Sequence, residues 1–182
     1  VGFQEGFNGN QYTKHVRPIL KRNGFYADTV RTSESNIGCF SRYPILEKKV
    51  ISHIERNDAA VFKIKLSNAD TLHFIVMHLK SMELSTEDRN IFQNNVENFR
   101  DNDTDDSLDY KGLFHVARKI ARASEPRAQQ AENVAKYIEE NKDKNIIVCG
   151  DFNDTPVSYT YRTIINAGNL EDAFVQAGNG LG

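Results

Sequence analysis

Residues 145–156 constrain the fold of this chain more than any other stretch. Residues 146–149 are Ile-Ile-Val-Cys, and this uninterrupted apolar run predicts a short strand that is buried on both faces, because a half-exposed strand would alternate apolar and polar residues. Gly150 ends the run. Thr155 followed by Pro156 is typical of a helix N-cap and a first helical position. The stretch therefore predicts a buried strand, a polar loop and a helix.

The polar loop carries Asp151, Asn153 and Asp154. Open α/β sheets bind their ligands at the C-terminal ends of strands, so these carboxylate and amide groups are candidate functional side chains. The same residue types also favour ordinary turns, and Asp154 could serve only as a partner of the helix N-cap. This stretch alone leaves these interpretations open.

Composition sets the broad class of protein. A chain of 182 residues with 39% hydrophobic residues suits one globular domain with a real core. The net charge of -2 gives no global basic field for nucleic acid or anionic membranes, and no apolar run is long enough to span a bilayer. Cys39 and Cys149 fit no metal-binding spacing, so we expect buried free thiols, with a disulfide left open.

Hydrophobic periodicity predicts a mixed α/β sheet with helices packed on it. Strands are expected at residues 25–30, 37–40, 45–54, 60–66 and 71–79, the last two forming a hairpin. Helices are expected at residues 11–22, which contain Pro18, from Glu125-Pro126 to about residue 138, and from Pro156 to Gly168, with a short element at residues 170–174. We interpret residues 1–182 as a single domain with a helical insertion at about 82–126, which contains an acidic loop at residues 101–109.

Three apolar strands end in ionisable or amide groups, namely Gln4-Glu5, residues 78–81 (His-Leu-Lys-Ser) and residues 150–153 (Gly-Asp-Phe-Asn). If these ends converge, the site holds two carboxylates, an imidazole and an amide. Hard oxygen ligands suit Mg²⁺ or Mn²⁺, whereas zinc is disfavoured by a single histidine and no thiolate. Such a set of groups could support a metal-assisted attack of water on phosphorus.

Five motifs occur in an order that resembles the endonuclease/exonuclease/phosphatase superfamily: Gln4-Glu5, residues 41–45 (Ser-Arg-Tyr-Pro-Ile), residues 78–81, Arg127 with Gln130, and residues 150–153. This superfamily includes pancreatic-type deoxyribonucleases, abasic-site endonucleases, sphingomyelinases and inositol polyphosphate 5-phosphatases. The resemblance implies an α/β (α+β) fold, in which a sandwich of two mixed β-sheets is flanked by helices.

The resemblance also implies roles for individual residues. Glu5 would be the ligand of Mg²⁺, with Mn²⁺ as a possible substitute. Asp151 would position or activate the attacking water, and Asn153 would orient that water and contact phosphate. His78 would contact the phosphate or the leaving group. Four further residues would support the site: Gln4, Ser81, Arg127 and Gln130.

Two family features have no counterpart in this sequence. The family carries a catalytic Asn on its first strand, and no residue precedes Val1 to supply it. The family also has an Asp-His pair near its C-terminus, and no histidine follows Asp154. We therefore expect an interior piece of a hydrolase domain, incomplete in its sheets and inactive in isolation. A signal peptide or membrane anchor could precede Val1, so the localisation stays open.

The predicted function is that of a Mg²⁺-dependent phosphoester hydrolase, a phosphodiesterase or a phosphomonoesterase. Its substrate could be a small molecule, a lipid head group or a nucleic acid. A nuclease is not favoured, because duplex binding usually brings a basic face. The alternative is a non-catalytic binding module that keeps the fold, and no protein partner is implied. The remaining histidines are interpreted as surface or packing residues: His15, His53, His73 and His115.

Overall fold

The computed structural model describes residues 1–4, 12–32, 36–67, 70–100 and 109–178. The chain divides into two compact units. We call the first the sandwich unit, which comprises Val1–Lys80 and Ala128–Gly182, and the second the helical unit, which comprises Ser81–Arg127. Each is described by itself below.

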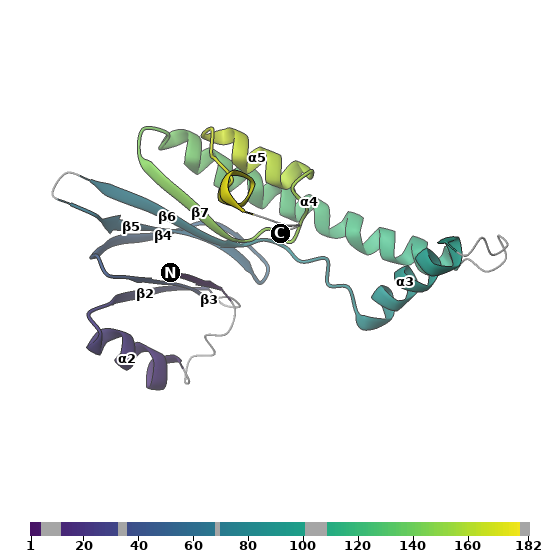
Figure 1. The fold of residues 1–182 in the computed structure, drawn as a ribbon, viewed down its shortest axis with the longest axis horizontal. Coiled ribbons are helices and arrows are strands. Elements are labelled where there is room, and N and C mark those ends of the chain that lie inside the picture. The colour runs from purple at the N-terminus through teal and green to yellow at the C-terminus, as the bar shows by residue number, and fades with distance from the viewer. Residues whose placement is uncertain (5–11, 33–35, 68–69, 101–108, 179–182) are drawn as a thin grey trace. The chain divides into compact units, whose positions relative to one another are not determined.

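The sandwich unit contains two β-sheets (Figure 1). The first is antiparallel, in the order β1-β3-β2, and consists of β1 (Gly2–Gln4), β2 (Tyr26–Arg31) and β3 (Asn36–Ser41). The second has the order β4-β5-β6-β7 and is mixed, because β6 and β7 are parallel while the other pairs are antiparallel. Its strands are β4 (Ile45–Ile54), β5 (Asn57–Lys65), β6 (Thr71–His78) and β7 (Asn145–Asp151).

Alternation along β5 explains how the layers stack. Ala60, Phe62 and Ile64 pack in one buried cluster with residues of β2 and β3, such as Ile37. The intervening residues, such as Val61, belong to a second cluster with residues of α4 (Tyr110–Glu140) and α5 (Tyr159–Ala167). Because successive side chains of a strand point to opposite faces, one sheet supports both cores. The predicted sandwich of two sheets flanked by helices is confirmed.

The helix predicted at residues 11–22 is divided in two. A π-helical turn, η1 (Tyr12–Val16), runs into α2 (Arg17–Arg22), which has Pro18 in its first turn. A proline at the start of a helix forfeits no intrahelical hydrogen bond, so restarting the helix at Arg17 accommodates Pro18.

Helix α4 begins earlier than predicted. It runs from Tyr110 through Pro126 without a break, so the prediction that a helix opens at Glu125-Pro126 is wrong. Buried positions recur at helical spacing on both sides of the proline, including Val116, Ala123 and Ala131. Continuous burial along one stripe stabilises the helix by more than the one hydrogen bond that an interior proline removes.

Strand β7 differs from the prediction of a strand buried on both faces. It is an edge strand of the four-stranded sheet as described, and Ile147 exposes 50% of its surface. A continuous apolar run is expected where a strand has neighbours on both sides, and among the described residues β7 is paired only with β6.

The helix after β7 also begins later than predicted. Ser158 is the N-cap of α5, and its hydroxyl accepts a hydrogen bond from the Tyr161 amide at 3.2 Å. Thr155 and Pro156 lie in the preceding turn, so the N-cap assigned to Thr155 is wrong. Both Thr and Ser are good N-caps, and only three-dimensional context selects between them. The predicted end at Gly168 is confirmed.

The helical unit contains α3 (Thr86–Arg100) and the first part of α4. Among its described residues the most buried carboxylate is Asp88, which accepts hydrogen bonds from Lys119 Nζ at 2.6 Å and from the Ser85 amide and hydroxyl at 2.7 and 2.8 Å. The hydrogen bond from Lys119, followed by those from Ser85, lowers the pKa of Asp88 to about 2. No helix in the described ranges is long and apolar enough to cross a membrane.

We expect acid to destabilise the helical unit through Asp88. Its pKa is lower in the folded state than in the unfolded chain, so its stabilising contribution is present above about pH 4 and is lost as the pH falls toward about 2. Hydrogen exchange of the α3 and α4 amides between pH 5 and pH 2 measures this loss. Asp88→Asn should remain less stable at pH 5 and show a flatter acid response. An acid response identical to that of the wild type would exclude Asp88 as its source.

Candidate active site

The ends of β6 and β7 place two predicted site residues side by side. His78 is the last residue of β6 and Asp151 the last of β7, and the two are register partners in the parallel pair. The pairing continues one step further, because the Leu79 amide donates to the Asp151 carbonyl at 2.9 Å. The C-terminal edge of this parallel pair therefore presents an imidazole and a carboxylate at neighbouring positions.

Gln4 and Asn153 join the same edge. The side-chain oxygen of Gln4, at the end of β1, accepts a hydrogen bond from the Asp151 amide at 3.1 Å. Asp151 Oδ1 accepts from the Asn153 amide at 2.7 Å, and Asn153 Nδ2 donates to the Leu79 carbonyl at 2.8 Å. Asn153 has a φ of 49°, a left-handed conformation that Asn tolerates better than most residues. The structure thus brings Gln4, His78, Asp151 and Asn153 together, while Glu5 lies outside the described residues.

The buried side chain of Gln130 bonds to the backbone next to this edge. It is fully buried, its Oε1 accepts from the Lys80 amide at 2.8 Å, and its Nε2 donates to the Asn57 carbonyl at 3.0 Å. The Asn57 side chain in turn donates a hydrogen bond to the Leu79 carbonyl at 3.1 Å. Buried amides that satisfy one another fix the backbone after β6, and the supporting role predicted for Gln130 stays a prediction. Sequence reasoning missed Asn57, although a polar pair directly before an apolar strand was a visible signal.

A histidine and a buried aspartate lie at the same end of this sheet, on the neighbouring strands β4 and β5. Asp58 is fully buried, and its two oxygens contact His53 Nδ1 at 2.5 Å and Thr32 Oγ1 at 2.9 Å. His53 was interpreted as a surface or packing residue, and Asp58 was not singled out. The clue for Asp58 was its place at the head of the buried stretch 57–62, where an unpaired carboxylate would be costly.

A family model described as the Endonuclease/Exonuclease/phosphatase family matches residues 1–181. The chain belongs to this family. Among curated proteins, none matches the sequence.

Solved structures of the Endonuclease/Exonuclease/phosphatase fold resemble the chain at low sequence identity. The human Nocturnin catalytic domain with a bound sulfate anion has 14% identity and a TM-score of 0.57, covering 95% of this chain and 58% of that one. A beta toxin from Staphylococcus aureus has 18% identity and a TM-score of 0.56, covering 94% and 59%. ANGEL2, titled a 2',3'-cyclic phosphatase, has 16% identity and a TM-score of 0.50, covering 94% and 47%. The chain therefore spans less than two thirds of each of these structures.

Two predicted supporting residues of the family motif belong to the helical unit. Ser81 is its first residue, and its hydroxyl accepts a hydrogen bond from the Glu83 amide at 3.3 Å. Arg127 is its last residue and is only 1% exposed. The roles given to these two residues stay predictions.

The described part of this family member offers a partial set of ligands for a hard cation. Asp151 is exposed, and its Oδ2 accepts no hydrogen bond from a described residue. The described residues contain no cluster of three His, Cys, Asp or Glu side chains arranged to hold a metal. Mg²⁺ commonly uses one or two carboxylates and keeps several waters, so a single protein ligand such as the predicted Glu5 suits this ion. The metal and its predicted ligand Glu5 stay proposals.

The two thiols are not candidates for nucleophilic chemistry. Both cysteines are free, as expected. Burial raises the pKa of Cys39 to about 11 and also raises the pKa of Cys149. Since the thiolate is the nucleophile, these raised pKa values disfavour the reactive form of both groups at neutral pH.

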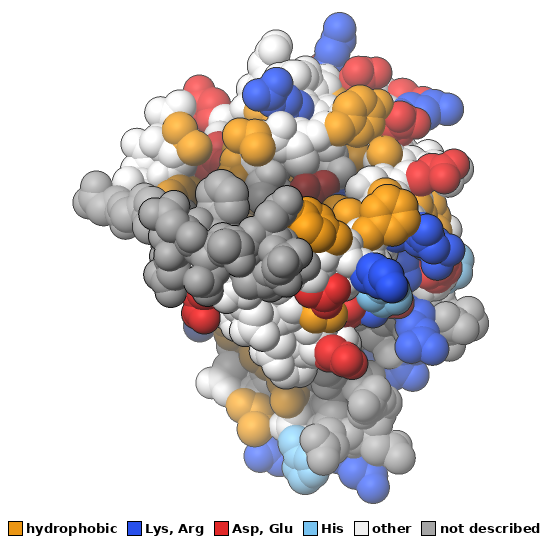
Figure 2. Space-filling view, turned by 90° about the vertical axis from the view of Figure 1, so that its right-hand side faces the viewer, with side chains coloured by type: hydrophobic (Ala, Val, Ile, Leu, Met, Phe, Trp, Pro, Cys, Tyr) orange, Lys and Arg blue, Asp and Glu red, His pale blue; other side chains and the backbone are white. Residues whose placement is uncertain are grey.

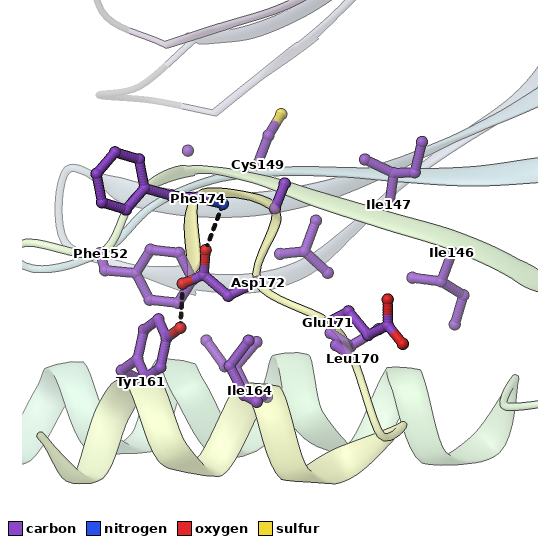
Figure 3. Close-up of a pocket in the computed structure, with 14 residues that line it drawn as sticks. Ile146, Ile147, Cys149, Phe152, Tyr161, Ile164, Leu170, Glu171, Asp172 and Phe174 are labelled. Carbon is purple, nitrogen blue, oxygen red and sulfur yellow. Dashed lines mark hydrogen bonds between the residues drawn. The ribbon is translucent and has the colours of Figure 1, made fainter. Parts of the chain in front are cut away.

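An apolar pocket of about 600 Å³ adjoins the Asp151 segment (Figure 3). Its lining comes from β7, α5 and the segment after α5, and includes Ile146, Phe152 and Phe174. Asp172 projects into it but is occupied, because it accepts hydrogen bonds from the Tyr161 hydroxyl and from the Phe174 amide. The pocket offers apolar surface beside the site and lacks the groups that phosphoester chemistry needs.

Proposed function

We propose that this chain carries part of the active site of a metal-dependent phosphoester hydrolase, with Mg²⁺ as the metal and Mn²⁺ as a substitute. The observation that carries the proposal is the adjacency of His78 and Asp151 at the shared end of β6 and β7. Two hydrogen bonds hold Asp151 in place, one from its own amide to the Gln4 side chain and one from the Asn153 amide to its carboxylate. The proposal is further supported by membership of the Endonuclease/Exonuclease/phosphatase family.

Each residue has a chemically distinct task in this proposal. Asp151 presents an exposed carboxylate that orients a water and accepts its proton. His78 donates a hydrogen bond to a phosphoryl or leaving-group oxygen. One N–H of the Asn153 side chain is used by the Leu79 carbonyl, which leaves the second N–H for a phosphoryl oxygen. A bound metal would stabilise the negative charge that develops on the phosphoryl group.

The substrate is proposed at the level of a chemical class. An anionic phosphoester is supported by the relatives, since one is titled a 2',3'-cyclic phosphatase and another holds a sulfate. Acidic and basic side chains both occur across the face drawn in Figure 2, in keeping with a net charge of -2. A mixed surface gives little general attraction to a long polyanion, so a small phosphoester or a lipid head group fits better than duplex nucleic acid.

A non-catalytic binding module is the second candidate. It needs no metal, only the polar side chains of His78 at the end of β6 and of Asn153, which donates to the Leu79 carbonyl beside it. In that case the same groups would bind a phosphate without hydrolysing it.

We expect the full-length protein to hydrolyse at least one member of a substrate panel in a metal-dependent way. The panel is bis-p-nitrophenyl phosphate, single-stranded and duplex DNA, sphingomyelin and inositol phosphates, assayed for released product. EDTA should abolish turnover, and Mg²⁺ or Mn²⁺ should restore it, because the metal stabilises the charge of the transition state. Turnover that survives EDTA would contradict the metal. Phosphate binding without hydrolysis of any substrate would favour the binding module.

A further inference from the structure

Four titratable side chains form a single row across the end of the four-stranded sheet. His53 of β4 is the register partner of Asp58 of β5, and His78 of β6 is the register partner of Asp151 of β7. The two pairs are joined by the pairing of Ala59 with Met77, since the next step brings Asp58 level with His78. Directly paired residues of a sheet point to the same face. The alternating row His53, Asp58, His78, Asp151 therefore lies on one face of the sheet.

Strand spacing places His53 within reach of a substrate bound at this edge. Neighbouring strands lie about 4.8 Å apart, so the backbone of His53 is about 10 Å from that of His78 and about 14 Å from that of Asp151. A molecule larger than one phosphate group would span this distance. A single phosphate held at His78 and Asp151 would not.

Asp58 fixes the orientation of the His53 ring. Its Oδ1 lies 2.5 Å from His53 Nδ1, and its Oδ2 accepts from the Thr32 hydroxyl at 2.9 Å. A carboxylate at Nδ1 keeps the proton on that nitrogen and directs Nε2 away, which is the arrangement that enzymes use to present an imidazole to a substrate. The His53 side chain is 41% exposed, and its Nε2 bonds to no described residue.

The cost of this arrangement argues for a use other than stability. Burying a carboxylate completely is unfavourable unless it is well paired, and its partner here is a surface imidazole and a hydroxyl. His73 provides a contrast, because it is itself buried and bonds to the Tyr137 hydroxyl at 2.9 Å inside the core. Replacing a buried ion pair by apolar residues is often neutral for stability, so stability alone does not account for Asp58 and Thr32.

Two charged residues near His53 form an ion pair with each other. Lys80, which follows β6, reaches across to Glu55 in the β4–β5 turn at 2.7 Å. This ion pair ties the turn to the end of β6 and offsets the charge of Lys80. Glu55 and Arg56 in this turn are the charged residues nearest to His53 along the chain, and its row on the sheet also holds Asp58, His78 and Asp151.

We propose that His53 is a substrate-contacting residue of this site and that the substrate carries a second anionic phosphate beside the one that reacts. This inference rests on the proposed function and narrows its substrate class. With Nδ1–H donated to Asp58, Nε2 donates to a phosphate oxygen when the imidazole is protonated.

The test compares substrates with one and two phosphates. The full-length protein is assayed with Mg²⁺ on two pairs, thymidylyl-thymidine with and without a 5'-phosphate, and inositol 1,4-bisphosphate beside inositol 1-phosphate. The pair of compounds that the wild-type protein hydrolyses with the higher kcat/KM shows whether the second phosphate comes from a nucleotide or from an inositol phosphate. In His53→Gln the ratio of kcat/KM for two phosphates over one should fall about tenfold, the effect of one hydrogen bond to a charged group.

A matched control is His115→Gln. His115 is also exposed and faces a buried carboxylate, Asp88, at 3.7 Å, but it belongs to the helical unit. This variant should keep the wild-type ratio. An unchanged ratio in His53→Gln would overturn the inference, and so would a lower melting temperature without any change in the ratio.

A binding measurement separates this inference from the proposed function. In EDTA, the two-phosphate compounds should shift the NMR signal of the His53 ring in wild-type protein, whereas inorganic phosphate should shift it much less. If the protein hydrolyses nothing but the signal shifts, the hydrolase proposal fails and the contact stands. If hydrolysis occurs but the ratio and the signal are both unchanged, the contact fails and the hydrolase proposal stands.

Discussion

Gly150→Ala should destabilise the sandwich unit by about 3 kcal/mol or more, because the substitution combines backbone strain with a backbone clash. Gly150 has a φ of +143°, which side chains other than that of glycine rarely allow. A Cβ at this position would lie 1.9 Å from the Met77 carbonyl oxygen, an atom of the neighbouring strand that cannot rotate away. Urea unfolding measures the loss. The displaced register of β6 and β7 should also separate His78 from Asp151 and lower any activity.

Gly24→Ala is the matched control for this prediction. Gly24 also has a positive φ, +75°, but a Cβ there would have no atom within 4 Å. Its substitution should cost only the left-handed strain of about 1–2 kcal/mol. Equal losses in the two variants would mean that the close approach of β7 to Met77 contributes nothing.

Local pattern was enough to predict most of the sandwich. The strand predicted at residues 45–54 has those bounds in β4, and the hairpin of β5 and β6 follows from their apolar runs on either side of a short polar loop. These elements depend on alternation and turn residues, which a sequence displays directly.

Other parts of the fold depend on contacts between distant residues. The passage of α4 through Pro126 depends on burial along the whole helix, which outweighs one local breaker. The edge position of β7 depends on which strands lie beside it, and the apolar sequence of β7 does not indicate how many neighbours it has. Neither the continuity of α4 nor the edge position of β7 can be predicted from local propensity.

The candidate site divides in the same way. The strand ends bearing Gln4, His78 and Asp151 could be predicted to converge, because polar groups at the ends of apolar strands are visible in the sequence. The pairing of His53 with Asp58 could not be foreseen, since it depends on a two-residue turn at Glu55 and Arg56 that pairs Ile54 with Asn57 and therefore His53 with Asp58. A shift of one residue in that register would turn His53 to the other face.

Asp151→Asn should lower kcat/KM of the full-length protein by about 10²–10⁴-fold on its best substrate, the usual contribution of a general base. The amide has the shape of the carboxylate and keeps an oxygen that can accept from the Asn153 amide, which lies 2.7 Å from Asp151 Oδ1. The loop should therefore keep its structure, and unfolding in urea should be unchanged. What the variant lacks is the negative charge that accepts a proton from water.

Asp154→Asn separates this role from a general effect of charge. It removes the same charge from the same loop, where Asp154 Oδ1 accepts from the Thr155 amide at 2.9 Å. If Asp151 acts on the water, Asp154→Asn should retain activity within a few-fold of wild type while Asp151→Asn does not. Turnover by Asp151→Asn equal to that of the wild type would refute the role of Asp151. An equal loss in both variants would instead assign the effect to the negative charge of the loop. A general base acts from one position, so its loss should appear in only one of the two variants.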